Sequence, residues 1–207
     1  MAKPNSASRA AQYYRKLLPQ WERAYPSTTA LEDAWAFYRE YGWEDPEAQL
    51  AAPLRQVSWR TQRILDFGCD TGVMLGFFAR RFPHAGLYGV DINTHALRQG
   101  RGLFPELNLV EFDGVELPFR DGYFDLIFAS AVLKHIRYGD RPALYSEFRR
   151  AASHLYVVDT YSEQQEVIEA NGFKFYHSDF RADLGATFRE RHFETIGEDF
   201  LALYELD

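Results

Sequence analysis

The sequence has few of the features that would place a protein in an oxidising compartment, in a membrane or on a nucleic acid. Its one cysteine, Cys69, cannot form an internal disulfide, which fits a cytoplasmic setting. No apolar run approaches the roughly 18 residues of a membrane span, and the N-terminus MAKPNSASRA lacks the apolar segment of a secretory signal. Basic residues number 23 against 30 acidic ones, so the formal net charge is −7 and we do not expect nucleic acid as a partner.

The sequence does contain enough apolar material for one well-buried core. Of its 207 residues, 46% are hydrophobic and 16% are aromatic, and there is neither an internal repeat nor a low-complexity tract. One domain with an appendage is the natural expectation at this length. Because the composition changes near residue 58, we expect a helical appendage or lid over residues 1–58 and a main domain over residues 59–207.

Aromatic residues recur at helical spacing in the first region. A second helix would end at Gly42, and a third would begin with Asp45 as its N-cap. The aromatic stripes predict packing on the main domain. They also suit a lid over a ligand, with Tyr14 and Trp21 as candidate substrate contacts, and both interpretations can hold for one helix.

The second region alternates between strand-like and helix-like segments. Candidate strands span residues 63–67, 87–90, 107–112, 124–129, 155–159, 173–176 and 200–206. Helical patterns lie between most of them, including one that Ser162 and Gln165 would open as a capping box. Strands separated by helices predict a Rossmann-like α/β fold, with a mostly parallel seven-stranded sheet and helices on both faces. No convincing helix precedes the last strand, so we expect that strand to be antiparallel.

A glycine-bearing loop follows the first strand in the run ILDFGCDTGVML. A dinucleotide-binding loop has the pattern G-x-G-x-x-G, but here Gly68, Asp70 and Val73 occupy the three positions. Two glycines are therefore missing, and Asp70 would bring an anion toward a diphosphate. These departures disfavour an NAD-dependent oxidoreductase and favour a cationic or zwitterionic ligand.

Acidic residues also follow the next two strands. Asp91 ends the second strand about twenty residues beyond the glycine loop, where a carboxylate can accept hydrogen bonds from ribose hydroxyls. Asp113 follows the third strand, and Ser130 and His135 follow the fourth. Because ligands of such sheets bind beyond the carboxyl ends of the strands, these residues predict one shared site.

This ordered set resembles the class I S-adenosylmethionine-dependent methyltransferases, in the branch that mostly modifies small molecules. The resemblance covers roughly residues 63–159 and departs from the family at Asp70, where a glycine is usual. It implies that Asp91 binds the ribose, that Ile92 lies beside the adenine and that Asp113 meets the adenine amino group. The cofactor-binding residues that it implies are Asp66, Gly68, Cys69, Asp70, Gly72, Asp91, Ile92, Asp113, Gly114, Val115 and Ser130.

The expected reaction is an in-line methyl transfer to an oxygen, nitrogen or sulfur atom of a small-molecule acceptor. His135 is the candidate general base, because an unperturbed histidine titrates near neutral pH. Asp159, at the end of the fifth strand, is a candidate substrate contact, and we expect no metal. An RNA or protein methyltransferase of the same fold, and a non-catalytic module that binds S-adenosylmethionine, remain as alternatives.

Overall fold

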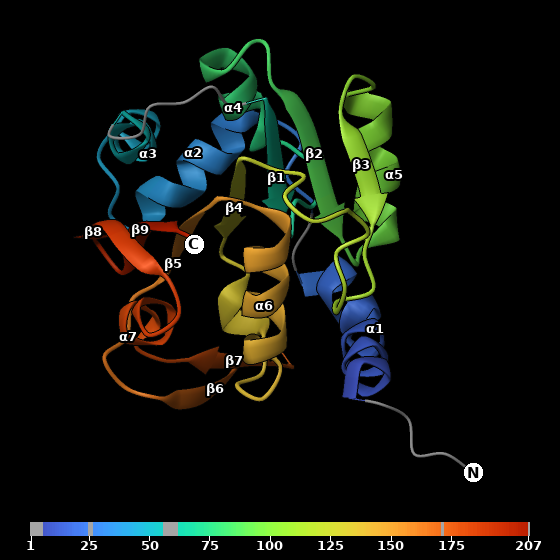
Figure 1. Cartoon of the computed structure of the whole chain (residues 1–207). Helices are drawn as coiled ribbons and strands as arrows, with labels where there is room; N and C mark the ends of the chain where they lie inside the picture. Colours follow the sequence, from blue (N-terminus) through green and yellow to red (C-terminus); the bar gives the residue numbers. More distant parts are fainter. Residues whose placement is uncertain (1–5, 25–26, 56–61, 171, 207) are drawn as a thin grey trace.

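The computed structural model describes residues 6–24, 27–55, 62–170 and 172–206. Its main sheet has seven strands in the order β3-β2-β1-β4-β5-β9-β8 (Figure 1). The strands are β1 (Arg63–Phe67), β2 (Gly86–Asp91), β3 (Asn108–Glu111), β4 (Leu126–Ser130), β5 (His154–Thr160), β8 (Arg189–Ile196) and β9 (Asp199–Glu205). Strands β1 to β5 pair in parallel, whereas β9 is antiparallel to both of its neighbours.

Alternate residues of each strand enter two separate cores, one on each face of the sheet. In β4, for example, Leu126 and Phe128 belong to one core, and Ile127 and Ala129 belong to the other. This is the two-residue period of a pleated strand. Because both faces are covered, the central strands are apolar almost throughout.

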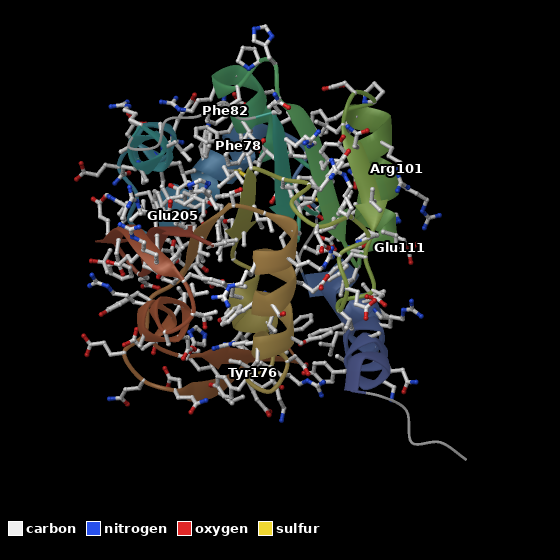
Figure 2. All side chains as sticks on the ribbon, viewed as in Figure 1. Phe78, Phe82, Arg101, Glu111, Tyr176 and Glu205 are labelled. Carbon is white, nitrogen blue, oxygen red and sulfur yellow. The ribbon has the colours of Figure 1, made fainter. Side chains whose placement is uncertain are left out.

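Helices from both regions of the chain cover the two faces. The core on one face includes residues of α1 (Ser6–Ala24), α6 (Arg141–Ala151) and α7 (Phe180–Gly185). The other core includes residues of α2 (Leu31–Glu40), α3 (Pro46–Leu54), α4 (Leu75–Arg81) and α5 (Thr94–Leu103). Phe78 on α4 belongs to this core (Figure 2), and its ring centroid lies 5.0 Å from that of Phe128 of β4.

The fold class predicted from the sequence is confirmed, including the antiparallel last strand. Local predictions in the N-terminal region are confirmed too: the Asp45 side chain accepts a hydrogen bond from the Ala48 N–H at 3.1 Å, and Gly42 follows α2 with φ +93°. The helices of this region share cores with the sheet. The expected boundary between residues 58 and 59 lies outside the described residues.

Two predictions about the C-terminal third were wrong. The segment expected to be a helix after Ser162 contains β6 (Glu166–Ala170), which pairs with β7 (Phe173–His177) in a hairpin outside the main sheet (Figure 1). The Ser162 hydroxyl bonds to the backbone of Gln164 and caps no helix. The strand expected at residues 173–176 is β7 of this hairpin and not a strand of the main sheet, whose edge is instead formed by β8, paired with β9.

Candidate functional site

Strand alternation places three polar side chains on one face of the sheet, at the edge where the parallel strands end. Asp66 follows Ile64 by two residues in β1, and Ser130 follows Phe128 by two in β4, so both face the core beneath α2. Asp199 begins β9 two residues before Leu201 of the same core. Since β9 runs antiparallel to β5, its first residue lies beside the last residue of β5, Thr160.

These side chains line a cleft that is partly open to solvent. Its walls come from α2, the glycine loop, the ends of β4 and β5, and the start of β9. The structure brings together in this lining six of the residues expected from the sequence: Asp66, Gly68, Cys69, Asp70, Ser130 and Asp159. The other expected residues whose side chains the structure describes lie outside the lining.

The glycine loop takes left-handed backbone conformations at several positions. Gly68 has φ +77°, and a Cβ atom there would lie 2.7 Å from a methyl carbon of Val132, so no larger residue fits without movement. Asp70 has φ +50°, in the region that aspartate tolerates better than most residues. This backbone conformation accounts for the glycine that is usual at the position.

The Asp70 carboxylate binds the segment between α1 and α2. Its two oxygens accept hydrogen bonds from the Ser27 hydroxyl at 2.8 Å and from the Thr28 N–H at 3.0 Å. The Thr71 hydroxyl donates to the Thr28 carbonyl oxygen. Asp70 therefore joins the N-terminal region to the glycine loop, and Thr28 becomes part of the cleft wall.

Asp66 is a buried carboxylate at the base of the cleft. Only 3% of its surface is exposed, and no hydrogen bond to its carboxylate occurs within the described part of the chain. Burial, reinforced by repulsion from Asp91 and Asp70, raises the pKa of Asp66 to about 8. A cation that entered the cleft would favour the ionised form of Asp66 and relieve this repulsion.

Asp91, at the end of β2, adjoins the glycine loop. Its carboxylate accepts hydrogen bonds from the backbone N–H groups of Asp70 at 2.8 Å and Asn93 at 2.7 Å. Burial raises the pKa of Asp91 to about 6 despite these bonds. Each carboxylate oxygen keeps further acceptor capacity, which the two hydroxyls of a ribose could use.

The loop after β3 lies beside α1. The Asp113 carboxylate accepts from the Val115 N–H at 2.9 Å, and Gly114 has φ +89°. A Cβ atom on Gly114 would lie 3.0 Å from the ring of Tyr14. Ile92 packs at the margin of the core that contains Tyr14. Of the residues expected around the adenine, Gly114 thus lies against α1, and Ile92 and Asp113 follow the ends of the paired strands β2 and β3.

The candidate substrate residues have separate environments. Tyr14 is buried, and its hydroxyl donates to Asp140 at 2.9 Å. Helix α1 includes Trp21, but the Trp21 side chain lies outside the described part. The Asp159 carboxylate lines the cleft and accepts from the backbone N–H groups of Leu133 and Thr160 at 2.8 and 2.9 Å.

His135 lies at the end of the short helix η1 (Leu133–His135), outside the residues that line the cleft. Its ring is 5.1 Å from that of Phe175 on β7. Burial, with smaller contributions from Lys134 and His177, lowers the pKa of His135 to about 3. A side chain in this environment is a weak base. The structure thus favours a packing role, and the role of general base stays a prediction.

Sequence reasoning assigned no site role to several polar residues that line the cleft, among them Tyr38, Lys134 and Asp199. Tyr38 of α2 shares a 2.6 Å hydrogen bond with the Ser130 hydroxyl. Lys134 bonds to the Thr160 hydroxyl at 3.0 Å and lies 3.7 Å from an Asp159 oxygen. Asp199 accepts from the Trp43 indole N–H at 3.0 Å. Lys134 precedes the candidate base His135, and Asp199 precedes the strand expected over residues 200–206. The contact from Tyr38 depends instead on how α2 packs on the sheet.

The glycine loop after β1 and the acid after β2 lie where the resemblance to the class I S-adenosylmethionine-dependent methyltransferases implies them, and the strand order and the antiparallel β9 give a Rossmann-like fold. A family model described as a methyltransferase domain matches residues 64–154. The chain therefore carries a class I S-adenosylmethionine-dependent methyltransferase domain, and S-adenosylmethionine is the cofactor of that class.

Two curated relatives and one solved structure agree with this assignment. The malonyl-[acyl-carrier protein] O-methyltransferase of Legionella pneumophila is 34% identical over 89 residues, which cover 42% of this chain and 31% of that protein. The ubiquinone/menaquinone biosynthesis C-methyltransferase UbiE of Vibrio vulnificus is 37% identical over 95 residues, which cover 42% of this chain and 36% of that protein. The chain thus spans about a third of the length of these relatives.

The solved structure is a TehB-like S-adenosylmethionine-dependent methyltransferase from Corynebacterium glutamicum. It is 16% identical, with a TM-score of 0.56 and 98% coverage of both chains, so the likeness concerns the fold. Of the helices in the described residues, none is long and apolar enough to cross a membrane.

Proposed function

We propose that this protein transfers a methyl group from S-adenosylmethionine to a small-molecule acceptor bound in the cleft beneath α2. The observation that carries the proposal is Asp66, a buried carboxylate to which no group in the described residues donates a hydrogen bond, at the base of a cleft beside a glycine loop. Such a group fits a ligand that is cationic and lacks phosphate. A diphosphate would meet the Asp70 and Asp91 carboxylates at unfavourable electrostatic energy.

The residues divide between the two ends of the cofactor. Asp91 would accept hydrogen bonds from the ribose, and Asp113 and Ile92 would lie on the adenine side. The glycine loop and Asp66 would surround the amino-acid and sulfonium end, because Gly68 permits close approach of the backbone. When bound, S-adenosylmethionine supplies an activated methyl group on a sulfonium centre that is a good leaving group.

Placement is then the main task of the protein. Aligning an acceptor atom ~3 Å from the methyl carbon can contribute roughly 7–11 kcal/mol to lowering the barrier. The Tyr38–Ser130 hydrogen bond fixes α2 over the end of β4, and the Asp70 contacts fix the segment before α2. Together they would hold the wall of the cleft still and exclude water from the transfer.

A small acceptor suits this enclosure better than a macromolecule. Helix α2 closes one side of the cleft, and the chain carries an excess of acidic residues, which disfavours RNA. The curated relatives are named for an O-methyl transfer to malonyl-[acyl-carrier protein] and a C-methyl transfer in quinone biosynthesis. Carbon therefore joins oxygen, nitrogen and sulfur as an acceptor atom to be tested.

The test is S-adenosylhomocysteine formation, measured by mass spectrometry, with panels of small amines, phenols, carboxylic acids, thiols and activated carbon acids. We expect turnover with one acceptor class and none without acceptor. Cofactor binding without product across every panel would favour the non-catalytic module. Turnover of bulk RNA or protein only would favour the macromolecular alternative.

A further inference from the structure

The cleft contains a further buried carboxylate, Asp199, that the cofactor assignment leaves unused. Asp199 is 7% exposed and lines the cleft from the start of β9. Its Oδ2 accepts the Trp43 indole N–H at 3.0 Å, and within the described residues Oδ1 receives no hydrogen bond. A carboxylate oxygen that receives no donor, on a buried residue that lines a cleft, is a site at which a ligand can donate.

The backbone around Asp199 is tightly packed. Gly197 turns between β8 and β9 at φ +58°, and a Cβ atom there would lie 1.9 Å from the Tyr41 carbonyl oxygen. The Glu198 N–H donates to that same oxygen at 3.2 Å. The turn after α2 thus packs against the β8–β9 turn and positions Trp43, which in turn orients the Asp199 carboxylate.

The charge of the cleft is strongly unbalanced. Among the described residues that line it, four are acids and one, Lys134, is basic. Lys134 is already engaged by Thr160 and Asp159 on β5, and the Asp159 carboxylate is satisfied by backbone N–H groups. Asp66 and Asp70 adjoin the glycine loop, so Asp199 is the acid left for the acceptor.

We propose that Asp199 is a specificity-determining residue that binds an amino group of the acceptor through Oδ1. This inference rests on the proposed function, and it names the acceptor as an amine rather than a carboxylate or phosphate. An ammonium group would donate to Oδ1 in a charge-assisted hydrogen bond within a partly desolvated cleft. An anionic acceptor would instead meet uncompensated negative charge.

The titration of Asp199 is compatible with this role. Burial raises the pKa of Asp199 to about 6, with opposing contributions from the Trp43 hydrogen bond and Lys134 and further increases from Asp159 and Glu198. Asp199 is therefore mostly ionised above neutral pH, and amine binding should strengthen as pH rises through about 6.

Protein-observed NMR with three matched probes, benzylamine, benzyl alcohol and benzoate, tests the inference on protein saturated with S-adenosylhomocysteine. The Trp43 indole resonance is the local reporter, because its N–H donates to Asp199. We expect benzylamine to bind about tenfold more tightly than benzyl alcohol, and benzoate to bind more weakly than both. Asp199→Asn should abolish the preference for the amine, whereas Glu198→Gln, the same charge change one residue away, should preserve it.

Three results would overturn the inference: benzoate binding as well as benzylamine, an amine preference that survives in Asp199→Asn, or no response of Trp43 to any probe at about 20 mM. The S-adenosylhomocysteine titration that precedes the probes judges the proposed function separately. If that titration shows no binding, the proposed function fails. The same three probes, added to ligand-free protein, then test whether Asp199 binds an amine.

Discussion

At the scale of single residues, Asp66 is an acid whose environment opposes its charge. The folded protein binds a proton at Asp66 up to about pH 8, whereas an unfolded chain releases it near the ordinary pKa of about 4. Between these values the native state holds more protons than the unfolded state, so the free energy of unfolding falls as pH rises. The uncompensated charge at Asp66 is thus a local cost to stability.

Asp66→Asn should remove this pH dependence. We expect the variant to lose less stability than the wild type between about pH 5 and about pH 8.5, as measured by urea unfolding. Asp113→Asn, which changes an exposed carboxylate, is the matched control and should follow the wild type. Parallel pH curves for the wild type and Asp66→Asn would show that Asp66 carries no raised pKa.

Asp91 acts on the cofactor and on the glycine loop at once. Asp91→Ala should weaken S-adenosylhomocysteine binding at least about tenfold, because two ribose hydroxyls and two backbone N–H groups lose an acceptor. Calorimetry gives the affinity, and thermal unfolding gives the separate effect on stability. Unchanged affinity would refute the ribose role.

At the scale of elements, the contact between Asp70 and the α1–α2 segment is the feature specific to this chain. Asp70→Gly would relieve a left-handed aspartate but remove the acceptor for Ser27 and Thr28. We expect faster hydrogen exchange at the Thr28 amide and little change in total stability, since the two effects oppose each other.

Asp70→Asn is the matched control for this element. An asparagine also tolerates a positive φ and keeps one carbonyl acceptor, so exchange at Thr28 should rise much less than in Asp70→Gly. If both variants leave the exchange rate at its wild-type value, Asp70 does not fix the segment that borders the cleft.

Helix α1 is attached to the region after β4 through Tyr14. The Tyr14 hydroxyl donates to Asp140 at 2.9 Å and accepts from the Arg137 N–H at 3.2 Å, and the Arg137 guanidinium stacks 4.2 Å from the ring centroid of Tyr13. Tyr14→Phe should cost about 1–3 kcal/mol in the free energy of unfolding, because it leaves buried polar groups without a partner. Chemical denaturation measures this loss, and a wild-type midpoint and slope would contradict it.

At the scale of the whole molecule, the sequence predicted the features that depend on strand period and strand order. Alternation and turn residues located β1 within its observed bounds and predicted that Asp66, Gly68 and Asp70 would converge on one site. The second half of the chain was harder to predict. β6 is exposed along its whole length, so burial periodicity did not mark it, and only its pairing with β7 makes it a strand.

The acceptor side of the site was also beyond the reach of sequence alone. Tyr38 and Trp43 are buried aromatic residues, and each also makes a hydrogen bond with a polar residue of the cleft. Those contacts join residues separated by 92 and 156 positions, which only the packing of α2 against β4 and β9 brings together.

The central claim is that buried carboxylates at one edge of the sheet bind a positively charged nucleoside that has no phosphate. Calorimetric titration of the full chain with S-adenosylmethionine tests this claim most directly. A separate titration with NADH, a dinucleotide that contains a diphosphate, is the comparison. The account predicts saturable one-to-one binding of S-adenosylmethionine that strengthens as pH rises through about 8, where Asp66 ionises, and no binding of NADH. Tighter binding of NADH, or no heat of binding with S-adenosylmethionine at any pH, would contradict it.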